Sequence, residues 1–192
     1  MEVNFTSEYS EIIKNLIQLN LLTKKSGEEI INEIALNLYN EENYHLTERD
    51  TFDKLPAVIR DIILVINLDT ELNMQGILGF LENSTGLFLN DTIETLQRIQ
   101  AEEDYDILKA IKSILEQNNV STQDLRNNVD NQMEYSITSF SETHSSKYDD
   151  MVSEISEVAD KLYLYDGDRN LFDYLIQYVD KNKNNLVGEL NK

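Results

Sequence analysis

Residue types that commonly carry out chemistry are scarce in this sequence. It contains two histidines, His45 and His144, and no cysteine. A histidine metal site needs several ligands, so two histidines nearly exclude one within a single chain, and the missing thiols exclude disulfides and cysteine nucleophiles. We expect both histidines at the surface, where most polar side chains lie. No Gly-rich phosphate loop, nucleophile elbow or His-Glu helix motif occurs, so the sequence predicts no enzyme, no metal and no cofactor.

One segment has the beginning of a calcium-binding loop. Asp166, Asp168 and Asn170 occupy its first, third and fifth positions, where oxygen ligands converge on a hard cation. The match then fails, because the sixth position is Leu171 and not glycine, and the twelfth is Gln177 and not glutamate. The closing glutamate supplies much of the affinity of such loops. The sequence therefore favours a turn in which Asp168 caps the last helix.

Carboxylates are abundant, and two groups of them stand out. One group opens a predicted helix, and the other recurs at helical spacing on a later one. Acids at a helix start complement its dipole, and rows of acids are commonly solvated faces, so neither group predicts catalysis. Like charges at helical spacing repel each other and destabilise the helix, so their presence suggests that they have a function. We take them as candidate contacts for a basic partner: Glu102, Glu103, Asp104, Asp106, Asp149, Asp150, Glu154 and Glu157.

The whole chain is acidic, with 36 acidic and 16 basic residues and a formal charge of −20. Divided at residue 96, its halves carry −11 and −9, so the charge is not confined to a tail. Such a charge repels nucleic-acid backbones and anionic lipids, so we expect no direct binding to nucleic acid or membrane. Duplex DNA also presents regular negative charge, and carboxylates on rigid helices can offer a DNA-binding protein a similar array.

Helices must position these carboxylates. One proline and six glycines among 192 residues are few for the many turns of an all-β protein, and apolar residues recur at helical spacing. The sequence predicts an all-α fold, a single domain over residues 1–192 with eight or nine helices. Helices are expected to begin after Thr6 or Ser7, at Ser26, near Pro56, near Leu72, at Asn90 or Asp91, at Glu102 and at Ser121, with one more helix before and one after Asp166 and Gly167.

Two polar stretches interrupt this helical pattern. Residues 40–50 are a loop candidate, and residues 133–146 are either a hinge or a long helix with a solvated face. The amino terminus lacks the features of a signal peptide, and the central apolar run at 62–66 is too short to span a bilayer. We therefore expect a cytoplasmic protein.

The middle of the chain carries a pattern that is independent of charge. Glu71, Asn73, Gly76, Asn83 and Gly86 are followed by an amphipathic stretch that ends near Ala101. This pattern resembles the core motif of a bacterial family of small, acidic, mostly uncharacterised helical proteins, whose best-known member is a dimeric DNA mimic. The resemblance covers roughly residues 50–120 and implies a helical fold.

Three positions depart from the motif. Gln75 stands where the first of two paired glycines is expected, Ile77 replaces a phenylalanine, and Gln100 replaces a late glycine. The matching residues themselves are of structural types. Gly76 and Gly86 permit tight backbone paths, and asparagines such as Asn83 favour caps and turns.

The resemblance and the charge together lead to the hypothesis of an acidic protein-binding module, a DNA mimic that occupies the cationic DNA-binding surface of a partner such as a transcription factor. The alternative is an immunity or antitoxin-like protein that neutralises a cognate toxin, since many nuclease toxins are cationic. A carboxylate metalloenzyme in a helical bundle would need two Glu-x-x-His pairs, and only Glu42 and His45 have that spacing.

Aromatic side chains concentrate near the carboxyl end of the sequence. Core packing is their first explanation, and a surface for homodimer formation is the second, because amphipathic rings suit interfaces. The residues are Tyr163, Tyr165, Phe172, Tyr174 and Tyr178.

Overall fold

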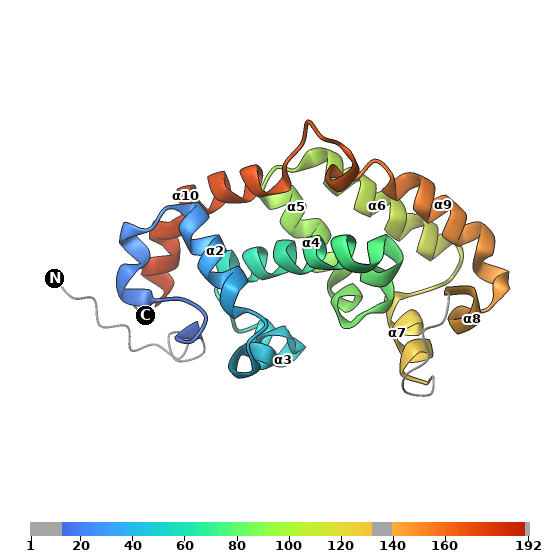
Figure 1. Ribbon diagram of the computed structural model, residues 1–192, viewed down its shortest axis with the longest axis horizontal. Helices are drawn as coiled ribbons and strands as arrows, with labels where there is room; N and C mark the ends of the chain where they lie inside the picture. The colour runs from blue at the N-terminus through green and yellow to red at the C-terminus, as the bar shows by residue number, and fades with distance from the viewer. Residues whose placement is uncertain (1–12, 132–139, 191–192) are drawn as a thin grey trace. The chain divides into compact units, whose positions relative to one another are not determined.

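The computed structural model describes residues 13–131 and 140–190, and every regular element in these ranges is a helix (Figure 1). The predicted all-α class is therefore confirmed. The described residues form nine α-helices, α2 to α10, in agreement with the expected eight or nine. In chain order the elements, with 3-10 helices labelled η, are η1 (Leu19–Lys24), α2 (Gly27–Asn37), η2 (Glu41–Thr47), α3 (Arg49–Phe52), α4 (Ala57–Glu82), η3 (Ser84–Phe88), α5 (Leu89–Arg98), α6 (Glu102–Gln117), α7 (Thr122–Asp130), α8 (Phe140–His144), η4 (Ser146–Tyr148), α9 (Asp149–Ala159), η5 (Tyr163–Tyr165) and α10 (Leu171–Leu190).

Internal contacts divide the chain into two compact units. The first unit comprises residues 1–66 and 172–192, and the second is the continuous segment 67–171. One boundary lies within α4, and the other follows the first residue of α10. A single domain over residues 1–192 stays a prediction, as does the family-like core at 50–120.

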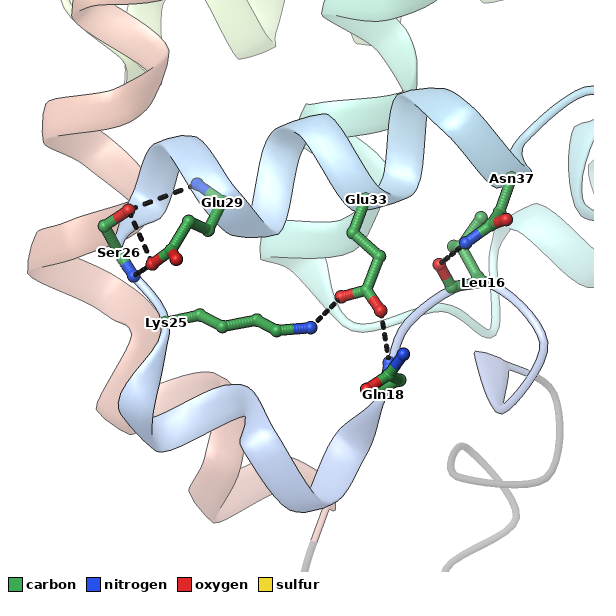
Figure 2. Close-up of polar contacts among 7 residues, drawn as sticks. All are labelled: Leu16, Gln18, Lys25, Ser26, Glu29, Glu33 and Asn37. Atoms are coloured by element: carbon green, nitrogen blue, oxygen red, sulfur yellow. Dashed lines mark hydrogen bonds and ion pairs between the residues drawn. The ribbon is translucent and has the colours of Figure 1, made fainter.

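In the first unit, Ser26 starts α2 as the sequence predicts. Ser26 Oγ accepts a hydrogen bond from Glu29 N (3.2 Å), and Glu29 Oε2 accepts one from Ser26 N (2.8 Å), which forms a capping box (Figure 2). The two bonds satisfy amides that a helix leaves free at its start. The bond from Ser26 N and a further bond from the Ser26 hydroxyl to Glu29 Oε2 (3.1 Å) also lower the pKa of the Glu29 carboxyl, since both favour its charged form.

Side chains of α2 also hold the segment that precedes it. Lys25 Nζ forms an ion pair with Glu33 Oε2, and Gln18 N donates to Glu33 Oε1 at 3.1 Å (Figure 2). Further along α2, Asn37 Nδ2 donates to the Leu16 carbonyl at 3.2 Å (Figure 2). These bonds fix the chain before α2 without a continuous helix.

The carboxyl-terminal helix α10 crosses close to the start of α2. Gly27 N donates to Asp180 Oδ1 at 2.9 Å. A Cβ atom at Gly27 would lie 2.7 Å from the Ile176 carbonyl oxygen, which is closer than a carbon atom can approach. The absence of a side chain at Gly27 therefore allows this packing. Nearby, Tyr178 donates its hydroxyl to the buried Asp61 at 2.6 Å.

Two sequence expectations for the first unit are wrong in the described residues. The helix expected to extend to about residue 25 is a turn followed by η1, and its earlier part, residues 1–12, lies outside the described residues. The loop expected at residues 40–50 is instead helical, as η2 and the start of α3. One reason is Asn43, a buried amide that donates to the carbonyls of Asn15 (3.3 Å) and Asn37 (2.9 Å).

The helix α4 is broken at a different position from the one expected. The sequence predicts two helices separated between residues 68 and 72, but the helix continues through that stretch. The interruption lies at Gly76, whose φ of 70° and ψ of −169° are not helical. A glycine adopts a positive φ without the Cβ clash of other residues, so the backbone turns there.

In the second unit, α6 packs against both α5 and α9. A residue with positive φ lies two positions after the last residue of α5 and of α6: Gln100 (66°) and Asn119 (54°). Ser121 then forms a capping box with Asp124 at the start of α7, as predicted. Of the polar stretch predicted at 133–146, residues 133–139 lie outside the described residues, and the rest forms α8, the connecting Ser145 and the start of η4.

None of the helices in the described ranges combines the length and the apolar character needed to cross a membrane.

Candidate partner-binding surface

The two acidic groups lie on helices that pack against each other, α6 and α9 (Figure 1). The helices run in opposite directions, because Tyr163, which follows α9, donates its backbone N to Asp104 at the start of α6 (2.9 Å). Both bury one apolar face: Leu108, Ile111, Ile114 and Leu115 from α6, and Met151, Ile155 and Ala159 from α9. The opposite faces remain in contact with solvent.

Seven of the eight predicted contact residues are exposed on these faces. They are Glu102, Glu103 and Asp106 on α6, and Asp149, Asp150, Glu154 and Glu157 on α9. We call these seven side chains the acidic surface. The sequence of α9 contains no lysine or arginine, so no cation of that helix neutralises its carboxylates. Their role as contacts for a partner stays a prediction.

Asp104 does not belong to this surface. Its side chain is only 2% exposed, accepts the hydrogen bond from Tyr163 N, and lies 3.6 Å from Arg169 Nη1. Burial raises the pKa of this carboxyl above its ordinary value, although Tyr163 and Arg169 act in the other direction. Asp104 is thus a structural residue. Its spacing of four from Leu108 and seven from Ile111 places it on the apolar stripe, which is the signal that sequence reasoning missed.

Arg169 is the cation that organises the acids at this end of α6. Its Nε lies 2.9 Å from Asp166 Oδ2 and its Nη1 lies 3.0 Å from Glu103 Oε2. The guanidinium also donates to the Lys161 carbonyl. Arg169 therefore holds the 161–169 segment against the start of α6. Nothing in the local sequence distinguishes it from a surface arginine.

Tyr163 connects the same segment to α4. Its hydroxyl donates to Asp69 Oδ1 at 2.6 Å, and its ring is buried. Burial and the Asp69 carboxylate raise the pKa of the Tyr163 hydroxyl, so it remains a donor. Core packing, the first explanation for the aromatic residues, therefore applies to Tyr163, whereas Tyr165 and Tyr174 are 56% and 37% exposed.

The distribution of charge between the two units is unequal. The second unit contains 21 acidic and 7 basic residues, a formal charge of −14, whereas the first contains 15 and 9, a charge of −6. The charges of the two sequence halves, −11 and −9, do not reveal this difference, because the first unit combines residues from both ends of the chain. The acidic surface lies in the more strongly charged unit.

Three of the predicted motif residues, Glu71, Asn83 and Gly86, form a structural cluster that links α4 to the turn that follows it. Glu71 Oε2 accepts from Asn83 Nδ2 at 2.7 Å, and Glu71 Oε1 accepts from the Thr85 hydroxyl at 3.2 Å. A Cβ atom at Gly86 would lie 2.4 Å from the Leu81 carbonyl oxygen, so only glycine fits there. The motif thus shapes the turn into η3.

Asn73 and Gly76 lie outside the hydrogen bonds of that cluster. Asn73 Nδ2 donates back to the carbonyl and the carboxylate of Asp69, at 2.8 and 3.1 Å. Gly76 forms the break in α4 described above. Thr85 is the member of the cluster that sequence reasoning missed.

The calcium-like segment is a turn. Arg169 N donates to the Asp166 carbonyl at 3.1 Å, and Asp168 N donates to Asp166 Oδ1 at the same distance. The last helix begins at Leu171, so Asp168 lies too early to cap it, contrary to the prediction. Across the described residues, no three or more His, Asp or Glu side chains are grouped to hold a metal ion.

The two histidines differ in environment. His45 is exposed, as expected. His144 is buried, contrary to the expectation, with Nε2 2.9 Å from Glu82 Oε2 and Nδ1 3.2 Å from Asn128 Nδ2. Polar partners from two other helices make its burial tolerable.

Comparisons with known proteins agree with the motif. A family model described as DMP19-like protein matches residues 53–182. The match includes nearly all of the 50–120 range that carried the resemblance and extends past α9 into α10. No curated protein and no solved structure matches the chain significantly.

Proposed function

The chain belongs to the family of DMP19-like proteins, and from this premise we propose that it is a protein-binding module. Its acidic surface binds a basic protein and, as a DNA mimic, occupies the surface with which that protein binds DNA. The proposal assigns no catalytic step and no cofactor to the chain. It also includes a cytoplasmic location, where DNA-binding proteins are encountered.

The observation that supports this proposal is the paired arrangement of α6 and α9. Rigid, packed helices hold the seven carboxylates of the acidic surface in a defined array, so little conformational entropy is lost when a partner binds. A charge of −14 on the unit attracts cationic proteins over distances comparable to the Debye length, about 8–10 Å in ordinary buffers. The same charge repels nucleic acid and anionic lipid.

Two variants with equal loss of charge test this proposal. The first, Asp106→Asn with Glu154→Gln and Glu157→Gln, removes three charges from the acidic surface. The second, Glu28→Gln with Glu41→Gln and Glu48→Gln, removes three exposed charges from the first unit. Exposed pairs contribute about 0.2–1 kcal/mol each, so the first variant should weaken partner binding by roughly 3- to 150-fold. The second should change it little.

The assay begins with capture of proteins from native cytosol at low salt. We expect a basic DNA-binding protein that is released both by added salt and by duplex DNA, because DNA and the acidic surface compete for one site. The proposal is wrong if no basic protein is captured in a salt-sensitive way, or if the two variants bind equally. A captured protein that is a toxin, and whose toxic activity the chain inhibits, would support the immunity alternative.

A further inference from the structure

A polar cavity in the second unit lies outside the acidic surface. Its volume is about 670 Å³, which is within the range of small-ligand sites. It lies between the residues at the start of α7 and the segment from α8 to η4. Most of the side chains that line it carry oxygen acceptors, including Asn119, Asp124, Asn128, Glu142, Ser145 and Tyr148.

The charges that line this cavity favour a cation. Asp124 and Glu142 supply two carboxylates, whereas Lys147 is the single lysine or arginine among the described lining residues. Asp124 Oδ2 accepts from Ser121 N (3.0 Å) and from the Ser121 hydroxyl, and these bonds lower the pKa of the carboxyl, so it is ionised at neutral pH. Lys147 Nζ lies 4.5 Å from the centre of the Tyr148 ring, so this ring already attracts one ammonium group.

One lining residue, His144, is held by contacts with two other helices. His144 is 4% exposed, and its two ring nitrogens contact Glu82 of α4 and Asn128 of α7. The ring of Phe140 lies 4.2 Å from the histidine ring. These contacts fix α8 relative to α7, so the lining residues of both helices have defined positions before a ligand binds.

One lining residue adopts a strained backbone conformation. Ser145 has φ 82° and ψ 143°. For Ser145 this region is occupied almost only by glycine, and the hydrogen bond from Ser145 N to the Ser141 carbonyl (2.9 Å) helps to maintain it. Strained residues concentrate where ligands bind, because the surrounding structure must stabilise a conformation that function requires.

We propose that this cavity binds a guanidinium or primary ammonium group. Such a group brings only hydrogen-bond donors, which match the carboxylate, amide and hydroxyl oxygens of the lining, and a planar guanidinium also stacks on a tyrosine ring. Anionic ligands are repelled by the charge of the unit. The group belongs either to a free compound such as a polyamine or to an arginine or lysine side chain of the basic partner, and only the second source rests on the proposed function.

Free arginine amide tests the site without any partner. The full chain is titrated with N-acetyl-arginine amide and, as a neutral control of the same shape, N-acetyl-citrulline amide, while backbone amide NMR shifts are followed. We expect shifts at residues 119–128 and 140–148 with the arginine compound and with spermidine, and none with citrulline. Equal shifts with citrulline, shifts that spread evenly over α6 and α9, or no shifts at all would overturn the proposal.

Two single-charge variants locate the site. Glu142→Gln removes a lining carboxylate, whereas Asp168→Asn removes an exposed carboxylate near the opposite end of α6. We expect Glu142→Gln to raise the Kd for arginine amide at least fivefold and Asp168→Asn to change it less than twofold. Equal effects of the two variants would contradict a defined site. Far-UV circular dichroism of both variants verifies that the fold is retained.

Partner binding then distinguishes the two sources. Weaker partner binding by Glu142→Gln, relative to Asp168→Asn, identifies an arginine or lysine side chain of the partner as the ligand. Unchanged partner binding, with free arginine amide or spermidine still bound in the cavity, identifies a free cation. If no basic partner exists, the proposed function fails while a positive titration still supports the site.

Discussion

The left-handed backbone conformation of Gln100, in the turn after α5, can be tested directly by substitution. Gln100 N donates to the Gln97 carbonyl at 3.2 Å, and Ala101 N donates to the Leu96 carbonyl at 2.9 Å. This pair of bonds forms a Schellman motif, whose central residue has a positive φ, here 66° at Gln100. Glycine is the usual residue at such a position, and Gln100 stands where the resembling family has glycine. We predict that Gln100→Gly stabilises the protein.

The size of this effect follows from two opposing terms. A left-handed conformation costs a residue with a Cβ atom about 1–2 kcal/mol, and glycine removes this cost. Glycine also loses more chain entropy on folding, which costs about 0.5–1 kcal/mol. Because the Gln100 side chain is exposed, little packing is lost with it. The net increase in the free energy of unfolding is about 0.5–1 kcal/mol, which corresponds to a rise in Tm of roughly 1–4 °C.

Urea unfolding followed by far-UV circular dichroism measures this change. The matched control is Gln97→Gly, which replaces the same residue type three positions earlier, inside α5, where the side chain is also exposed. A helical position loses stability with glycine, so the control should fall by about 0.5–1 kcal/mol. The two substitutions therefore have opposite signs. If both destabilised the protein by a similar amount, Gln100 would not be in the left-handed conformation and the reasoning would be refuted.

Three further predictions concern single contacts. Gly86→Ala should destabilise the protein by about 3 kcal/mol in urea unfolding, since its Cβ would meet backbone oxygen, whereas Gly167→Ala, with open space around it, should change little. Asp104→Asn should gain stability relative to wild type as the pH rises above 3.8. The pKa of Asp104 is raised in the folded state, so its contribution to wild-type stability is largest below pH 3.8 and is lost as the pH rises to the folded pKa; parallel pH profiles of the two proteins would contradict this. Ser26→Ala should reduce stability by about 1 kcal/mol and move the pKa of Glu29 part of the way toward 4.5 in an NMR titration, because the bond from the Ser26 hydroxyl is lost while the bond from the backbone N of residue 26 remains; an unchanged pKa would exclude the hydroxyl as a cause.

Local features of the fold were predictable from neighbouring residues. Ser26 and Ser121 cap the helices that they were expected to start, because a capping box involves residues only three positions apart. The apolar spacing of α6 and α9 likewise predicts which faces are buried, and hence why seven of the eight candidate acids are exposed. The position at which a helix is interrupted was less predictable. The interruption of α4 is at Gly76, which has a positive φ, and not at the polar residues where it was expected.

Contacts between distant residues were not predictable in the same way. The environment of Asp104 depends on Tyr163 and Arg169, which lie about 60 residues later in the chain. His144 is buried because Glu82, 62 residues earlier, and Asn128 provide polar partners. No local pattern marks these residues, because each contact exists only when separate helices are packed together.

The sequence by itself determined the helical class, the acidic character, the motif around Glu71 and Gly86, and the two acidic helices, because these properties depend on composition and short spacing. Only the tertiary structure decided which acids remain available to a partner and where the charge accumulates. It buries Asp104 under Arg169 and Tyr163, and it gathers both chain ends into one unit, which leaves the second unit with a charge of −14. Packing selects among residues that the sequence presents as equivalent, because burial and pairing depend on helices that are far apart in the chain.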